Sequence, residues 1–414
     1  MSLLVDLSGV QAAQTDIDTI GNNIANVATA GFKGSTPDFS DVYAGSLAGA
    51  AGANTTPGQG VNTTSLAQLF TEGTINQTGD PLNVAINGNG FFQLQTPSGI
   101  AYGRDGNFQL DSSGYLVTDT GAQVMGFAPP VSGSSANGPL QPIQVPGGSI
   151  AAVPTANLTI GVNLPSTDPA IDTGTTPFSA SNASSYDESS TTTVYDSLGG
   201  SNTLTTYFTQ VSGSGAPNQW QTNWQLSNSS GAAVASGTGP TLTFNSSGQL
   251  TSGSGTIAIS NLPDGAANLN IATSFSGSTL SNLTFGVNSI TNDGYGAGQF
   301  TGVEISSGGQ ITGQFSNGLT RNYGTIALAD FANPQGLIPT SGNVWLASTA
   351  SGSPVLGSPG SSSLGTLESG ALEGSNVDLS AQLVNLIAAQ QAYQANVQGI
   401  NVEQQNLQRL LTIQ

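Results

Sequence analysis

The chain has 414 residues, of which only 7% are charged, and its 23 acidic residues against four basic ones give a net charge of −19. Binding to nucleic acids or to anionic membrane surfaces needs clustered basic side chains, which four scattered residues cannot supply. The absence of cysteine and histidine excludes disulfides, the usual zinc sites and catalysis by an imidazole base.

The length and the polar, uncharged composition predict several domains built mainly from short strands. A single hydrophobic core stops growing at about 250–300 residues, so two to four domains are expected. Glycine supplies 56 residues, which favours tight turns. No apolar run approaches the ~20 residues that span a bilayer. The first residues, Met1 to Asp6, lack the basic and apolar regions of a signal peptide, so export by a cleaved signal is not expected.

The N-terminal residues have the heptad spacing of an amphipathic helix. Apolar side chains recur at intervals of four and three residues, and the series is interrupted at Gln14 and Gly21. The pattern predicts a helix that ends near Ala30, with Gly31 as the residue after its C-cap. Residues 31–70 are then rich in Gly, Ala, Ser and Thr and predict a linker arm.

From residue 71 onwards the pattern changes to short alternating runs joined by turn residues. Hairpins are predicted at Asn87–Gly90, Asp111–Gly114, Asn245–Gly248 and Gly308–Gly309. A proline- and glycine-rich stretch that ends at residue 149 marks a boundary, and residues 149–285 contain six acidic residues and no basic one. We therefore interpret 149–285 as an inserted outer β domain, 71–148 with 286–358 as one discontinuous β domain, and 359–374 as a second linker arm.

The C-terminal forty residues carry the longest heptad pattern in the chain. A helix over about 377–412 would be about 54 Å long and needs a partner along its length. Ser375 and Asp378 match a capping box at its start. The two terminal segments, 1–30 and 375–414, are predicted to pack on each other as a coiled-coil domain, although each could instead lie on a domain of its own.

The combined heptad positions form a seam that is too polar at Gln14, Gly21, Gln390 and Gln404 to hold one intramolecular pair firmly. We therefore interpret it as a polymerisation seam. Its members are Leu3, Leu7, Val10, Ile17, Ile24, Leu379, Leu383, Leu386, Tyr393, Val397, Ile400, Leu407 and Leu411.

No pattern selects a catalytic, metal or cofactor site, so no cofactor and no enzymatic activity are expected. Trp220 and Trp224 lie on one face of a predicted strand, where they could form a sugar-binding platform or, in the alternative that we favour, pack in a core.

Three long motifs resemble the bacterial flagellar rod and hook proteins. Two of them, Asn22–Lys33 and Glu373–Ser380, lie near the chain ends, and Tyr102–Phe108 resembles the β domain that this family shares. Ala389–Asn396 is also similar, except that Gln391 stands where many relatives have a basic residue. The extra domain at 149–285 is expected of hook proteins and absent from the shorter distal rod protein.

The resemblance implies a non-enzymatic subunit that assembles into a flexible tube, transmits motor torque as a universal joint, and is exported through the flagellar type III apparatus. It implies contacts with further copies, with rod, hook-cap and hook–filament junction proteins, and a place outside the cell. Phe39 and Tyr43 resemble a segment that engages the export gate, or they pack on a neighbouring segment. The alternatives are a distal rod-type subunit and, from another class, a secreted β-rich adhesin or glycan-binding protein.

Overall fold

The computed structural model describes residues 2–42, 58–130, 138–211, 218–260 and 262–412, and these residues are mainly β with one helix near each end. The described chain divides into two compact units. The first comprises residues 1–147, 302–314 and 320–414, and the second comprises 148–301 and 315–319. The mainly β fold with terminal helices is the predicted one, and within the described residues no helix is long and apolar enough to cross a membrane.

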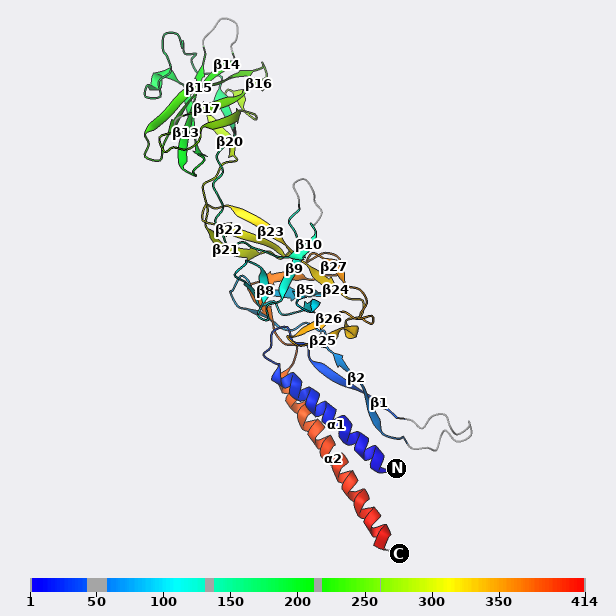
Figure 1. Ribbon diagram of the computed structural model, residues 1–414. Coiled ribbons are helices and arrows are strands. Elements are labelled where there is room, and N and C mark those ends of the chain that lie inside the picture. Colours follow the sequence, from blue (N-terminus) through cyan, green and yellow to red (C-terminus); the bar gives the residue numbers. More distant parts are fainter. Residues whose placement is uncertain (1, 43–57, 131–137, 212–217, 261, 413–414) are drawn as a thin grey trace. The chain divides into compact units, whose positions relative to one another are not determined.

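The first unit contains both helices, α1 (Ser2–Ala25) and α2 (Leu379–Thr412), which lie side by side (Figure 1). Its strands are β1 (Ser35–Asp41), β2 (Val61–Gln68), β3 (Ile75–Gln77), β4 (Val84–Asn87), β5 (Phe91–Thr96), β6 (Gly99–Gly103), β7 (Phe108–Leu110), β8 (Leu116–Thr118), β9 (Gln123–Phe127), β10 (Leu140–Pro142), β23 (Thr320–Ile326), β24 (Leu328–Asp330), β25 (Ile338–Thr340), β26 (Val344–Leu346), β27 (Val355–Gly357), β28 (Thr366–Ser369) and β29 (Ala371–Glu373). Strands β21 (Phe300–Ile305) and β22 (Gln310–Phe315) belong mostly to this unit.

The central sheet of the first unit has the strand order β21-β22-β23-β9-β5-β6-β26-β25. Aromatic side chains from strands distant in sequence fill one part of its core: Phe91, Tyr102, Phe331 and Trp345 are buried together, with Phe70 against them. Phe91 meets Trp345 edge to face with 5.7 Å between the ring centroids. This packing holds residues 91–103 against residues 331–345, which precede and follow the second unit in the sequence.

Both α-helices are shorter than predicted, for identifiable reasons. α1 stops at Ala25, where the Asn26 side chain donates to the Asn22 carbonyl oxygen over 3.0 Å. Gly31 has φ +65°, yet it lies six residues beyond Ala25, and a Cβ there would lie 2.6 Å from the Asp105 backbone nitrogen. Gly31 is therefore required by a close approach to the β domain, and it is no helix cap.

The start of α2 also differs from the predicted capping box. Asp378 is itself the N-cap, since its Oδ1 accepts from the backbone nitrogens of Ser380 at 2.8 Å and Ala381 at 3.2 Å. Ser375 instead accepts from Val377 ahead of the helix. A carboxylate is a strong N-cap and favours the positive end of the helix dipole, which explains why the helix begins at Leu379, two residues later than predicted.

The predicted linker arms contain paired strands. β1 and β2 form an antiparallel ribbon within 31–70, with a bulge at Asp38/Phe39. β28 pairs with β4, and β29 pairs with β3, within or beside 359–374. The turn at Asn87–Gly90 is not a hairpin, because β4 pairs with β28 while β5 pairs with β6, β9 and β24. Local turn chemistry could not show that a strand 280 residues away would supply the partner.

Three other predicted hairpins are confirmed. β7 pairs with β8 around Asp111, whose Oδ1 accepts from the Ser113 and Tyr115 nitrogens at 2.8 Å. β15 pairs with β16 around Asn245, whose side chain makes the equivalent pair of bonds. β21 and β22 are neighbours joined through Gly309, which has φ +77°.

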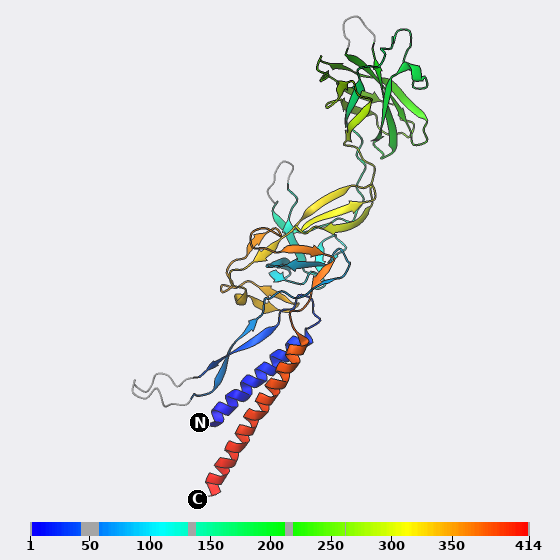
Figure 2. The ribbon, with the colours of Figure 1, turned by 180° about the vertical axis from the view of Figure 1, so that it is seen from behind.

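The second unit consists of two five-stranded sheets, and Figure 2 shows the whole chain from behind. One sheet contains β11 (Asn157–Pro165), β17 (Ser254–Ile259), β18 (Leu269–Ser274), β19 (Thr279–Ser281) and β20 (Gly286–Asn292); the other contains β12 (Glu188–Tyr195), β13 (Ser201–Gln210), β14 (Gln219–Ser227), β15 (Ala233–Phe244) and β16 (Leu250–Ser252).

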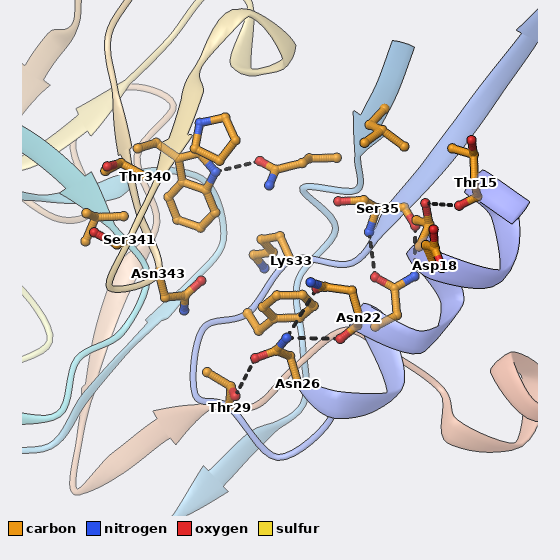
Figure 3. A pocket seen from close by; sticks show the side chains of 18 residues that line it. Thr15, Asp18, Asn22, Asn26, Thr29, Lys33, Ser35, Thr340, Ser341 and Asn343 are labelled. Carbon is orange, nitrogen blue, oxygen red and sulfur yellow. Dashed lines mark hydrogen bonds between the residues drawn. The ribbon is translucent and has the colours of Figure 1, made fainter. Parts of the chain in front are cut away.

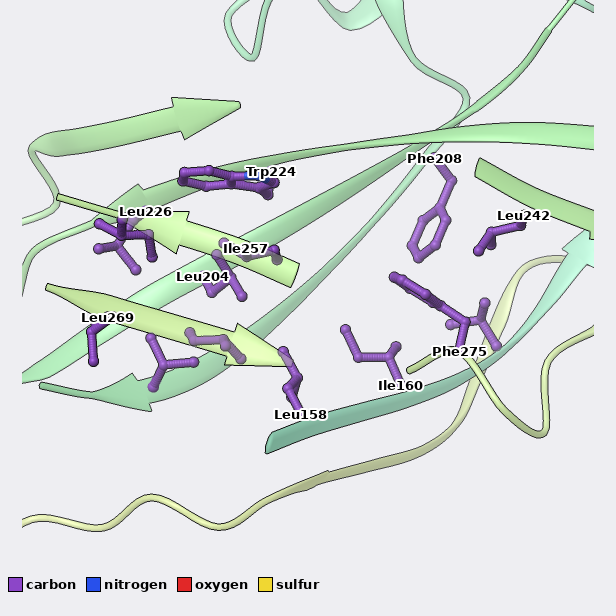
Figure 4. Packing of buried hydrophobic residues seen from close by; sticks show 14 of the residues in the cluster. Leu158, Ile160, Leu204, Phe208, Trp224, Leu226, Leu242, Ile257, Leu269 and Phe275 are labelled. Carbon is purple, nitrogen blue, oxygen red and sulfur yellow. The ribbon is translucent and has the colours of Figure 1, made fainter. Parts of the chain in front are cut away.

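One core lies between these sheets, since both contribute alternating side chains to the same cluster (Figure 4). Ile160 and Ile271 come from one sheet, and Leu204 and Phe208 come from the other. Trp220 and Trp224 belong to this cluster, with 0% and 6% of their surfaces exposed, so they pack in a core as favoured and form no platform. The unit is thus a two-layer β structure with its own hydrophobic core.

We expect Leu204→Ala to lower the free energy of unfolding of the second unit by about 2–5 kcal/mol, because it leaves a cavity between the sheets. Leu204 is fully buried, whereas Leu198 of the same unit is 66% exposed and provides the matched control. Leu198→Ala should cost less than about 1 kcal/mol. Urea unfolding followed by tryptophan fluorescence measures both, and equal effects would contradict the assigned core.

Candidate functional site

The two terminal helices are antiparallel and in a defined register. A Cβ on Gly9 would lie 2.8 Å from the Asn396 side chain, and one on Gly399 would lie 3.1 Å from that of Asp6. At the other end, the Asn23 amide donates to Gln382 over 3.5 Å. In all three pairs, position n of α1 faces position 405 − n of α2.

Small and polar residues fill most of the line of contact between the helices, and the buried Ile20 is the large apolar exception on α1. Gly9, Ala13 and Asn23 supply this line on α1, and Ala389 and Asn396 supply it on α2. Ala13 and Ala389 are buried, with 8% and 4% of their surfaces exposed. Short side chains allow the two helix axes to approach closely, but they bury little apolar surface. The pair is therefore well defined in register and weak in hydrophobic stabilisation.

The predicted seam residues do not form this contact line. The α1 positions 6, 9 and 23, which contact α2, and the buried positions 13 and 20 each lie one residue before a heptad position of the seam. Leu3, Leu7, Leu379, Leu383, Leu407 and Leu411 stay 40–77% exposed. Val10, Ile17, Ile24, Leu386, Tyr393, Val397 and Ile400 are half-buried beside the contact line.

The two seams lie on the same side of the helix pair. Each is displaced by one residue from its contact line, which rotates it in the same sense about its own helix by about 100° at 3.6 residues per turn. Because the helices run in opposite directions, equal rotations bring both seams to one face. Six of the thirteen seam residues are exposed and seven are half-buried, so we interpret the two seams as one partly exposed apolar face beside the contact line.

A buried cluster of charges lies where the helices join the β domain. Lys33 Nζ is 2.6 Å from Glu373 Oε1, and the Arg104 guanidinium is 3.3 Å from Glu373 Oε2. At most 4% of the surface of any of the three residues is exposed. Two of the four basic residues in the chain thus share one carboxylate.

Neutral groups also bond to these charges, although Arg104 Nε and Glu373 Oε2 have no hydrogen-bond partner among the described residues. Lys33 also donates to the Thr71 carbonyl oxygen at 2.7 Å, and the Gly73 nitrogen donates to Glu373 at 3.0 Å. Arg104 donates to the Gly88 carbonyl at 2.9 Å, and its guanidinium lies 5.7 Å from the centre of the Phe91 ring. Burial lowers the pKa of Lys33 and that of Arg104, and the neighbouring Glu373 opposes both shifts.

Asparagine side chains tie the chain ends to the β1–β2 ribbon and to the β domain. The Asn23 amide exchanges hydrogen bonds with the backbone of Ser35 at 2.8 and 3.0 Å. Asn376 accepts from the Gly34 nitrogen and donates to the Leu69 carbonyl. Asn343 donates to the Ala30 carbonyl over 2.8 Å. The base of the helix pair is therefore held by directional polar contacts, which fix geometry more than they bury area.

The proposed export segment is only partly described. Phe39 lies on β1 with 43% of its surface exposed, opposite Thr63 of β2. Tyr43 lies outside the described residues. The described residues also contain no group of three or more acidic, histidine or cysteine side chains arranged to hold a metal ion.

Sequence reasoning did not find the Lys33–Glu373–Arg104 cluster, although all three residues lie in the motifs quoted above. One signal was available: a chain with four basic residues places two of them inside long specific motifs, where a charge needs a partner. What pattern could not show is which of the 23 acidic residues would meet them.

Four family models match consecutive parts of the chain. They are the flagella basal body rod protein model (residues 3–33), the flagellar hook protein FlgE/F/G D1 domain (85–163), the flagellar basal body protein FlaE D2 domain (163–295) and the flagellar basal body rod FlgEFG protein C-terminal model (368–413). The cluster residues Lys33 and Glu373 fall in the two terminal models, and Arg104 falls in the D1 model.

Relatives of known name match the chain along its length. The flagellar hook protein FlgE of Salmonella typhimurium strain LT2 is 40% identical over 423 residues, covering 100% of both chains. That of Escherichia coli K12 is 40% identical over 98% of both, and that of Borreliella burgdorferi is 32% identical over 100% of this chain and 99% of its own. The crystal structure of Helicobacter pylori flagellar hook protein FlgE2 matches the fold with a TM-score of 0.56 at 16% identity, covering 71% of this chain and 99% of that one.

We expect Glu373→Gln to lower the free energy of unfolding of the first unit by about 3–5 kcal/mol, because it leaves two cations buried without a counter-charge. Glu304→Gln is the matched control, since Glu304 is exposed on β21 and only accepts from Gln314. It should cost about 1 kcal/mol or less. Denaturant unfolding followed by far-UV circular dichroism measures both; indistinguishable midpoints would show that the cluster does not hold the unit together.

Proposed function

The chain belongs to the flagellar hook protein family, and from that premise we propose how it builds the hook of which it is a structural subunit. Subunits assemble into a flexible tubular helical polymer that couples motor torque from the rod to the filament. The observation that carries this proposal is the partly exposed apolar face of the helix pair, together with hook relatives of full matching length. A contiguous exposed apolar face of this kind marks a site of contact with another protein.

A tube made from one kind of subunit needs contacts between different surface patches. When such heterologous contacts do not close into a ring, they generate an open helical polymer. In this proposal the seam residues of 1–30 and 375–414 form the inner wall as a coiled-coil layer, and the nested β domains lie outside it. The rod-type alternative is less well supported, since the relatives that match over the whole chain are hook proteins.

The low surface charge suits a polymer that bends while it turns. Lys33 and Arg104 are buried, which leaves Arg321 and Arg409 as the remaining basic residues of the chain. Fixed ion pairs between subunits would favour one register, whereas surfaces of Gly, Ser, Thr and Asn can slide with a small change in energy. We infer that this composition supports the universal-joint role.

The remaining assignments follow from the family. We propose that the subunit is exported by the flagellar type III apparatus without a cleaved signal, lies outside the cell, and contacts rod, hook-cap and hook–filament junction proteins at the ends of the polymer. The absence of cysteine and the weak contact line between the helices suit a chain that is exported unfolded and orders on assembly.

Cells that lack this protein should have no hooks, and a plasmid copy should restore curved hooks in electron micrographs of detached flagella. Leu7→Asp should fail to restore them while the purified monomer keeps its unfolding midpoint, because Leu7 is 45% exposed in the single chain and covered only on assembly. Leu198→Asp, at a leucine that is 66% exposed in the second unit, is the control and should restore hooks. Normal hooks with Leu7→Asp would contradict the proposed seam.

Phe39→Ala should reduce the amount of subunit exported from the cell if Phe39 engages the export gate. Phe39 is accessible on a two-stranded ribbon, as a recognition residue must be. Leu66→Ala, on the partner strand and 57% exposed, is the control. Immunoblots of culture supernatant and of cells from a strain unable to polymerise the subunit measure export; unchanged secretion with Phe39→Ala would remove this assignment.

A further inference from the structure

A groove of about 680 Å³ lies beside the base of the helix pair in the first unit (Figure 3). Asp18, Asn22 and Asn26 of α1 line one wall, and the β25–β26 turn with Ser341 lines another. Leu66 of β2 and Val344 add apolar surface. Leu66 is 57% exposed, although it borders a concave site. The groove is thus a mixed apolar and polar surface lined by one carboxylate, that of Asp18, and by Lys33, which is paired with Glu373, and no described segment of the chain lies in it.

The opposite end of the helix pair carries a projection. With position n of α1 facing position 405 − n of α2, Ser2 faces Glu403, so residues 404–412 extend beyond α1. Figures 1 and 2 both show α2 continuing past the N-terminal end of α1. These nine residues form a helical end of about 14 Å. Leu407 and Leu411 on it are 48% and 77% exposed.

The projection cannot reach the groove of its own chain. The groove residues of α1 lie between Thr15 and Asn26, whereas the projection begins beyond Ser2. About 20 Å or more of straight helix separates the two sites at the usual rise per residue. A contact between them must therefore join two copies head to tail, which is the kind of contact that gives an open polymer.

We propose that the projecting end of α2 from one subunit docks in the α1/β25–β26 groove of the next. The proposal rests on the polymer function above and names two of its mating surfaces. Leu407 and Leu411 pack toward Leu66 and Val344, and Arg409 comes close to Asp18.

Charge favours this pairing over other placements of the projection. Arg409 is the only basic residue in either helix, in a chain of net charge −19. Asp18 is exposed on the groove wall, where its one described side-chain partner is the neutral Gln14 amide at 2.8 Å. Most random contacts between two copies bring acidic surfaces together, so an arginine at the tip and an aspartate in the groove select this one.

Cross-linking tests the proposal directly, because the chain has no cysteine of its own. Ser341→Cys in the groove and Gln408→Cys on the projection are both at exposed positions. A short bismaleimide applied to detached hooks of the double variant should give a ladder of covalent oligomers on denaturing gels, and none with dilute monomer. Ser247→Cys with Gln408→Cys is the control pair and should give no ladder.

Charge exchange gives a second, independent measurement. Asp18→Arg and Arg409→Asp should each lower the number of hooks per cell several-fold, and the double variant should restore it. If the unaltered chain forms normal hooks, the cysteine pair gives no ladder and the double charge variant does not restore the number of hooks, the docking contact is overturned while the polymer function stays intact. A lack of hooks on expression of the unaltered chain in the deletion strain would overturn the polymer function, and the docking contact with it.

Discussion

The carboxylate of Glu373 determines how the ends of this chain join the rest of it. It forms ion pairs with Lys33, which follows α1, and with Arg104, which belongs to the β domain, while its own strand leads into α2. A buried ion pair often stabilises no more than apolar residues of the same size would, but an unpaired buried charge is costly. The cluster therefore acts mainly as a condition: the three segments dock together or leave a charge unpaired. If one of the three segments is absent, the charges of the other two have no equivalent arrangement.

This condition explains why the contact between the helices can be weak. Gly9, Ala13 and Ala389 bury little surface, so the helix pair depends on its base for position and on neighbours for stability. The register set at the base, through Asn23 and Gln382, continues to Asp6 and Gly399 without a shift. The larger apolar side chains are displaced to one face. A single chain thus holds its helices in register and leaves part of their hydrophobic surface exposed, which in the proposed polymer other copies cover.

Prediction from sequence succeeded where local chemistry decides and failed where partners are distant. The turns at Asp111 and Asn245 are made by side chains bonding to residues two and four positions on, so their sequences suffice. The heptads identified both helices, but a line of small residues one position away was invisible to a search for apolar side chains. The strands in 31–70 were missed because β1 consists mostly of polar residues, half-buried or exposed, and therefore lacks the apolar alternation that predicts a strand. The Lys33–Glu373 pair spans 340 residues, and no spacing rule reaches that far.

The distribution of charge connects these features with the motion that a hook must allow. Withdrawing Lys33 and Arg104 from the surface leaves copies that carry like charge and repel one another diffusely. Diffuse repulsion has no preferred register, so its energy changes little when one subunit shifts slightly against its neighbour. In the proposed tube, registry between neighbours comes from shape and apolar contact along the helices, close to the tube axis, where bending changes distances least. The same scarcity of cations then lets the outer domains of the proposed tube slide while the inner helices hold.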